Sequence, residues 1–194
     1  MTLITGTPFS ENPRDLILNR AKGIICENQS LFGAVHGSTQ PATQVVYGYA
    51  FGLAAGDVVT GIAFATQTAA SGTNPTTIRA GLANSTGTMV AVSGNVNTTA
   101  FQALGIASLA VSYTVPTSGL YYGCYVVNGT WGTTQALLWR GETTGTSIIT
   151  ALGSNPIPAF IWTGQTDLPT VGNPLTLTTT VNFGFYMAIA GTPV

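Results

Sequence analysis

Residues 108–127 read SLAVSYTVPTSGLYYGCYVV. Bulky side chains alternate with small or polar ones over residues 108–115, and this period of two predicts a strand with one buried face. Pro116 and Gly119 then interrupt the alternation with residues that favour turns. Over residues 120–127 both alternating sets are apolar or aromatic. We therefore predict a hairpin whose second strand lies inside a sandwich or against another subunit.

Short alternating segments separated by turn residues continue on both sides of this hairpin. The strongest candidates are QVVYGYAFGL (44–53), DVVTGIAFATQ (57–67), TIRAGLA (77–83), TMVAVSG (88–94) and LTLTTTVNFGFYMAIAG (175–191). Asn84–Gly87 predicts a turn between two of them. The last segment predicts either one long strand or two strands with a kink near Gly184. Together, about eight to ten strands favour an antiparallel all-β sandwich, and we expect a jelly roll over residues 31–194.

Residues 1–30 differ from the rest in composition and predict a short N-terminal helical arm. They hold three of the five basic residues and three of the six acidic residues. Asn12 and Pro13 suit the start of a helix, and Gly23 suits its end. The segment is either a packed cap on the β domain or an arm that docks it to a larger object. The residues expected to make the docking contacts are Arg14, Leu16, Ile17, Arg20 and Lys22.

Few side chains are charged. Asp, Glu, Lys and Arg make up 6% of the chain and the formal net charge is −1, whereas about 25% of residues are charged in an average globular protein. This composition argues against nucleic acid and anionic membrane as partners, and no apolar run is long enough to predict a membrane span. The first residues lack the basic start and apolar core of a secretory signal, so we expect synthesis in a cytoplasm.

Residues suited to catalysis or metal binding are scarce. His36 is the only histidine, and its spacing from Cys26 and Cys124 matches no zinc site. The two cysteines form either a disulfide or, as is more common in a protein made in a cytoplasm, two buried thiols. Half of the six carboxylates lie in the arm, and Asp57 suits a turn, which leaves few for a hydrolase pair or a calcium site. We expect no enzyme activity, no metal and no cofactor.

Two tryptophans near loops suggest a binding surface. Trp131 is preceded by Thr130 and followed by Gly132, and Trp162 lies in a short apolar segment between prolines. An aromatic ring can stack on a sugar while polar neighbours bind its hydroxyls. We therefore take Trp131 and Trp162 as candidate glycan-binding residues and expect Trp131 to be the more exposed. The alternative is that these rings belong to the core or to a subunit interface.

Three segments of the chain resemble the jelly-roll modules of tail, fibre and decoration proteins of tailed bacteriophages. They are DVVTGIAF (57–64), TIRAGLANSTGTMVAVS (77–93) and LAVSYTVPTSGLYYGCYVV (109–127). The GLYY segment and the aromatic segment VNFGFYMAIAG (181–191) are also similar to tumour necrosis factor-type jelly rolls, which are trimers. That likeness implies a homotrimer whose threefold axis is lined by residues from the set Tyr121, Tyr125, Phe183, Phe185 and Tyr186.

The resemblance implies a structural protein of a bacteriophage virion, made in the host cytoplasm. We expect a capsid decoration or a tail-associated module that contacts copies of itself and other virion proteins, anchored through its N-terminal arm. The alternative is a receptor- or glycan-binding module at the tail tip, which binds a host-surface glycan. The chain lacks the residues expected of an enzyme in either case.

Overall fold

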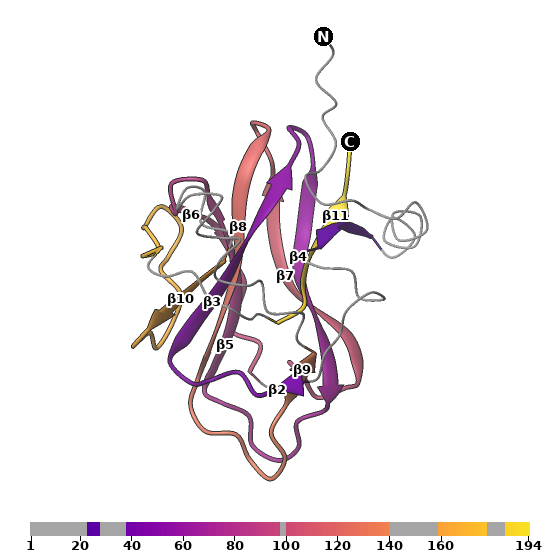
Figure 1. The fold of residues 1–194 in the computed structure, drawn as a ribbon, viewed down its shortest axis with the longest axis vertical. Helices are drawn as coiled ribbons and strands as arrows, with labels where there is room; N and C mark the ends of the chain where they lie inside the picture. The colour runs from indigo at the N-terminus through magenta and orange to yellow at the C-terminus, as the bar shows by residue number, and fades with distance from the viewer. Residues whose placement is uncertain (1–22, 28–37, 98–99, 140–158, 178–184) are drawn as a thin grey trace, which may run out of the picture.

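The computed structural model describes residues 23–27, 38–97, 100–139, 159–177 and 185–194. Every regular element in these ranges is a β-strand, and the strands form two antiparallel sheets that face each other (Figure 1). The predicted all-β class is therefore confirmed. The predicted helix and the docking contacts up to Lys22 lie outside the described residues.

Sheet A holds the strands β1 (Ile24–Glu27), β2 (Ser38–Thr39), β4 (Val58–Thr68), β7 (Gly105–Thr114), β9 (Leu137–Trp139) and β11 (Met187–Thr192). They are ordered β1-β11-β4-β9-β2, and β7 pairs with β4 outside this path. Sheet B holds β3 (Val45–Leu53), β5 (Thr77–Asn84), β6 (Met89–Val92), β8 (Gly119–Asn128) and β10 (Ala159–Thr163), in the order β10-β3-β8-β5-β6.

The predicted hairpin over residues 108–127 is wrong. Its two halves are the strands β7 and β8, but β7 pairs with β4 in sheet A while β8 pairs with β3 and β5 in sheet B. The connection is tied to the turn before β4, because Val115 N donates to Asp57 O (2.9 Å) and Gly56 N donates to Val115 O (2.8 Å). The turn residues therefore carry the chain across the sandwich. The prediction that the second of these strands is covered on both faces is confirmed, since residues 121–127 of β8 are buried.

The turn at Asn84–Gly87 does join a hairpin, β5–β6. Gly87 N donates to Asn84 O (2.9 Å), and the Asn84 side-chain oxygen accepts from Thr86 N (3.1 Å) and Thr88 N (2.9 Å). Gly87 has a φ of +85°, which favours glycine. The short-range turn chemistry of asparagine and glycine thus predicts this connection correctly.

The first and last described strands are neighbours in sheet A, where β11 lies between β1 and β4. Ile24 and Cys26 pair with β11, so residues 24–27 belong to the sandwich although we assigned them to the arm. The prediction of one strand over residues 175–191, or of two with a kink near Gly184, is wrong at its start, because residues 175–177 are not in a strand and Leu175 packs on sheet B. Residues 178–184, which include the expected kink, lie outside the described residues, and β11 begins at Met187. The apolar terminal strand does lie inside its sheet, as an exposed apolar edge would favour aggregation.

Inward-facing side chains of both sheets form one core rich in aromatic rings. Phe64 of β4 meets Tyr125 of β8 edge-on, with 4.7 Å between ring centroids, and Tyr125 stacks on Tyr47 of β3 at 5.3 Å. Phe185, just before β11, packs edge-on against both tyrosines. Each fully buried ring contributes about 1.5–3 kcal/mol by leaving water. This layer holds the two sheets together.

The outer face of sheet B is also apolar, and the chain covers it itself. Tyr122, Cys124 and Val126 point to this face from β8 and are 2% exposed or less. Residues 164–177, here called the strap, follow β10 and place Leu168 and Leu175 against this cluster. Backbone hydrogen bonds join the strap to Gln44, just before β3, and to the β5–β6 hairpin. An intramolecular segment therefore accounts for the second apolar face of β8.

Candidate functional site

The expected exposure of Trp131 is wrong. Its side chain is 6% exposed and packs on Phe101, with ring centroids 6.4 Å apart. The loops before β5 and before β9 meet around it, joined by the bridge between Ser71 and Thr134. Gly132 allows this approach, since a Cβ there would lie 2.4 Å from Thr73 N. The glycine that suggested an open loop is needed because two backbones touch there.

Trp162 keeps part of its surface open. It lies on the edge strand β10 opposite Val46 of β3, and its ring packs partly buried against the outer-face cluster of sheet B. The ring of Phe160 lies over Gly48 and packs edge-on against Tyr122, with 5.8 Å between the two ring centroids. Trp131 and Trp162 therefore belong to different parts of the molecule, one in the core between the sheets and the other on the far side of sheet B.

The expected threefold interface is wrong for the four of its five residues that the structure describes. Tyr121, Tyr125, Phe185 and Tyr186 are each 5% exposed or less within a single chain. Phe183 lies outside the described residues. The alternating apolar pattern correctly predicts that these side chains are buried. They are buried by residues of the same chain, however, and not by other subunits as we expected.

Tyr186 is buried on the outer side of sheet A and has a charged partner. Its hydroxyl donates to a carboxylate oxygen of Glu27 over 2.8 Å. Burial raises the pKa of Tyr186 above its ordinary value, and the negative charge of Glu27 raises it further. The pair ties β1 to the start of β11 through side chains, in addition to the strand pairing.

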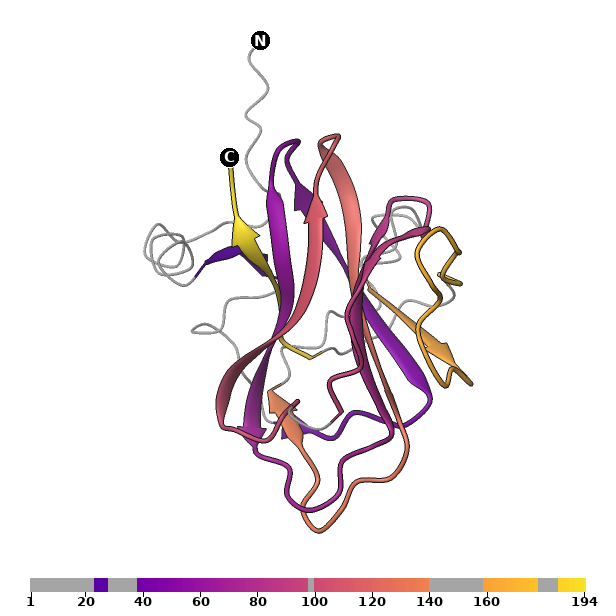
Figure 2. The ribbon, with the colours of Figure 1, turned by 180° about the vertical axis from the view of Figure 1, so that it is seen from behind.

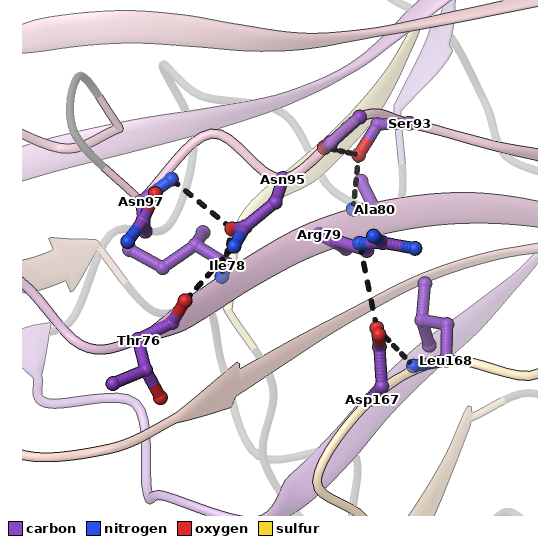
Figure 3. A network of polar contacts seen from close by, with 10 residues as sticks. Thr76, Ile78, Arg79, Ala80, Ser93, Asn95, Asn97, Asp167 and Leu168 are labelled. Atoms are coloured by element: carbon purple, nitrogen blue, oxygen red, sulfur yellow. Dashed lines mark hydrogen bonds and ion pairs between the residues drawn. The ribbon is translucent and has the colours of Figure 1, made fainter.

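A polar network follows the outer edge of β5, and it is the candidate interaction site with the most described contacts (Figure 3). After β6 ends, side-chain oxygens accept from N–H groups of β5, while the β5 carbonyls still accept from the backbone N–H groups of Ser93 and Val96. The Ser93 hydroxyl accepts from Ala80 N (3.0 Å), and the Asn95 side-chain oxygen accepts from Ile78 N (3.0 Å). The Asn95 amide also donates to Thr76 O (2.8 Å). These side chains cap the edge of sheet B and so limit pairing with another strand there.

The same network includes the ion pair between Arg79 and Asp167. Arg79 points to the outer face of β5, and its Nε lies 3.5 Å from Asp167 Oδ1, in the strap. The side chains are 32% and 44% exposed, so the pair adds only about 0–1 kcal/mol. Asp167 also accepts from Leu168 N (2.8 Å). The pair therefore positions the strap more than it stabilises the fold.

The loops at one end of the sandwich form an uncharged polar rim. Residues 69–76 and 129–136 contain no charged side chain, and within them Ser71, Thr73 and Thr133 are exposed. The Thr76 hydroxyl donates to Asn128 O (3.0 Å), which links the two loops. The backbone of Phe101 beneath the rim has a φ of +61°, a costly conformation held here by ring packing. The rim offers hydroxyls and amides, the groups that bind sugars through hydrogen bonds.

The remaining reactive groups have structural contacts. Asp57 is buried in the turn before β4, as its turn assignment predicts, and its carboxylate accepts from Ala54 N (2.8 Å) and Val194 N (3.1 Å). No disulfide joins Cys26 and Cys124. Burial raises the pKa of Cys124 to about 12, which keeps this thiol protonated and unreactive at neutral pH.

Metal and membrane features can be assessed only for the part of the chain that the structure describes. There, His, Cys, Asp and Glu side chains do not gather in threes at a possible metal site. His36 lies outside that part. No helix among the described residues is long and apolar enough to cross a membrane.

Comparison with known proteins found no match. No protein-family model matches the chain, and neither a curated protein nor a solved structure is significantly similar to it.

Proposed function

We propose that the chain is a structural protein of a bacteriophage virion, built as a jelly roll and used as a capsid decoration or tail-associated module. A jelly roll is a long hairpin rolled into two sheets, so its first strand pairs with its last, its second with its next to last, and so on inward. When the extra strands β2, β9 and β10 are set aside, the pairs β1–β11, β3–β8, β4–β7 and β5–β6 follow this rule. This pairing scheme is the observation that carries the proposal.

The surface chemistry supports an assembly role. A net charge of −1 with 6% charged residues leaves little long-range repulsion between copies. We propose a homotrimer that also contacts other virion proteins, through its N-terminal arm, after synthesis in the host cytoplasm. Because the aromatic residues first expected at the trimer axis are buried in one chain, the contacts between copies must use other surfaces.

Two experiments test this function. Sedimentation equilibrium of the purified full chain should give three times the monomer mass or a whole multiple of it, and a stable monomer at micromolar concentration contradicts the trimer. Antibodies against the chain should label intact phage particles in electron micrographs, at the capsid or at the tail. Label absent from particles whose genome encodes the chain contradicts the virion location.

A glycan-binding module at the tail tip is the second candidate, and the uncharged polar rim is the observation that favours it. Exposed hydroxyls of Thr73 and Thr133 can bind sugar hydroxyls. The buried ring of Trp131 cannot stack on a sugar there, whereas partly exposed Trp162 can do so at a distance from the rim. Binding to a glycan array should fall in the Thr133→Val variant if the rim binds, or in Trp162→Ala if the aromatic site binds. Unchanged binding in both variants contradicts both sites.

A further inference from the structure

Strand β7 has one side without a strand partner among the described residues. It pairs with β4 from Thr114, opposite Val58, to Gly105, opposite Thr66. Among the described strands only β4 is hydrogen-bonded to β7, the two lying side by side in Figure 2, while β5 and β6 approach β7 from across the sandwich. Alternate N–H and C=O groups of an edge strand point away from the sheet, and they form a template on which another extended strand can pair. The partner that fits this side is therefore a β-strand.

Over Gly105–Ala110 this edge lacks the charges, prolines and bulges that commonly prevent such pairing. Residues 100–115 contain no charged residue and no proline, although lysine and proline commonly protect natural edge strands. The register with β4 is regular over Gly105–Ala110, and the irregularity comes after it. By contrast, side chains of Ser93 and Asn95 cap the edge of sheet B. The edge at β7 thus differs in its protection from the edge of sheet B at β5 and β6.

Apolar side chains next to this edge are exposed. Leu104 is 71% exposed and Ile106 is 42% exposed, and both lie at the start of β7. Further along the outer face of the strand, Ser108 and Ala110 are small and exposed, so a second backbone can approach without a clash. Covering the two large side chains gives the pairing an apolar contribution.

We propose that the open edge of β7 pairs with the same edge of a second copy, antiparallel about a twofold axis. In such a contact each strand supplies both the template and its partner, and the same residues meet on both sides. The segment carries no charge, so two copies meet without repulsion between like charges, which is costly across an interface. The sheets A of two chains then form one continuous sheet.

This contact is independent of the proposed threefold assembly. A twofold contact and a threefold contact in one particle give closed dihedral symmetry. A change that breaks only the twofold contact halves the mass of the particle, whichever other contacts remain. That halving separates the present inference from the virion function.

The test compares two lysine substitutions of equally exposed residues in sheet A. Ile106→Lys puts a charge on the open edge, whereas Val58→Lys is the control because Val58 is 41% exposed on β4, which has neighbours on both sides. Ile106→Lys should halve the mass in sedimentation equilibrium and raise the dissociation constant about tenfold or more, because a lysine on an edge strand opposes pairing and an apolar side chain is lost from the contact. Val58→Lys should keep the wild-type mass.

Each outcome has one meaning for the proposal. An Ile106→Lys protein with wild-type mass, or a wild-type monomer at micromolar concentration, overturns it. A wild-type trimer that both variants preserve also overturns it and leaves the proposed function standing. A wild-type dimer that becomes monomeric only in Ile106→Lys supports it and contradicts the trimer. Thermal unfolding of both variants shows whether the fold is intact.

A crosslink reports the pairing directly. Ser108 lies near the middle of the regular stretch and is exposed, while the native Cys26 and Cys124 are 7% and 0% exposed. Ser108→Cys should give a covalent dimer with a short bismaleimide, and Thr117→Cys, in the exposed turn after β7, should not. Equal crosslinking of both variants, or none at Ser108→Cys, overturns the twofold contact at β7.

Discussion

Two buried tyrosine hydroxyls should respond in opposite ways to the same substitution. Tyr125 and Tyr186 are both 0% exposed. The Tyr125 hydroxyl has no hydrogen-bond partner among the described residues, whereas the Tyr186 hydroxyl donates to Glu27 over 2.8 Å. Replacing either tyrosine with phenylalanine removes one oxygen atom and keeps the ring. The pair therefore isolates the energy of one hydroxyl in each of two environments.

The size of each effect follows from the hydrogen bonding. A buried polar group without a partner costs about 1–3 kcal/mol, and the small void left by one oxygen offsets part of the gain on removal. We expect Tyr125→Phe to raise the free energy of unfolding by about 1 kcal/mol. A hydrogen bond to a charged group contributes about 1.5–3 kcal/mol, so Tyr186→Phe should lower the free energy of unfolding by about 2 kcal/mol.

Urea unfolding at pH 7, with all proteins at one concentration, measures both changes. With a urea dependence of about 2 kcal/mol per molar, the midpoint of Tyr125→Phe should rise by about 0.5 M, and that of Tyr186→Phe should fall by about 1 M. A loss of 1 kcal/mol or more in Tyr125→Phe refutes the reasoning, because its hydroxyl then has a partner. Shifts of the same sign in both variants refute it as well.

Three further changes test the packing of Phe160 on Gly48, the hydrogen bonds of buried Asp57 and the burial of the Cys124 thiol. Gly48→Ala should lower the free energy of unfolding by about 1–3 kcal/mol, because the added Cβ would lie 2.1 Å from the ring of Phe160. Gly52→Ala is the control, since its Cβ would enter open space, and it should change the free energy of unfolding far less in the same urea titration. Asp57→Ala should cost about 2 kcal/mol, since two backbone N–H groups lose their acceptor; an unchanged melting temperature contradicts this role. Burial raises the pKa of Cys124 from 9.0 to about 12. Between pH 9 and pH 12 the thiol therefore loses its proton in the unfolded chain but keeps it in the folded chain. The free energy of unfolding then falls by up to about 1.4 kcal/mol per pH unit as the pH rises. Stability measured between pH 9 and 10 should fall less steeply in Cys124→Ala, and equal slopes contradict the burial of the thiol.

Alternation of side chains predicted most of the strands, because a period of two is a local property of the backbone. It could not predict how strands pair. The same residues at Val115–Gly119 suit a hairpin or a crossing between sheets, and the choice depends on hydrogen bonds to the distant turn at Asp57. The prediction of the Asn84–Gly87 turn is confirmed because the hydrogen bonds that close the turn lie within it and the adjoining residues.

The candidate site residues failed for a related reason. Alternation marks Tyr125 as buried, but a buried face can be covered by the other sheet, by a strap or by another copy, and the sequence pattern is the same in each case. Trp131 seemed accessible beside Gly132 because glycine is common in open loops, whereas here it permits close contact between backbones. Leu168 and Leu175, apolar residues next to prolines, were the available signal for the strap.

The place of β11 between β1 and β4 has a consequence during synthesis. Residues 24–27 leave the ribosome more than a hundred residues before their partner strand, Met187–Thr192. Until then sheet A of the nascent chain lacks the strand between β1 and β4, and the apolar side chains of these two strands are accessible to chaperones or to other nascent chains. Completion of sheet A therefore waits for β11 to leave the ribosome, and products that stall or end before β11 should be captured by the cell's quality control.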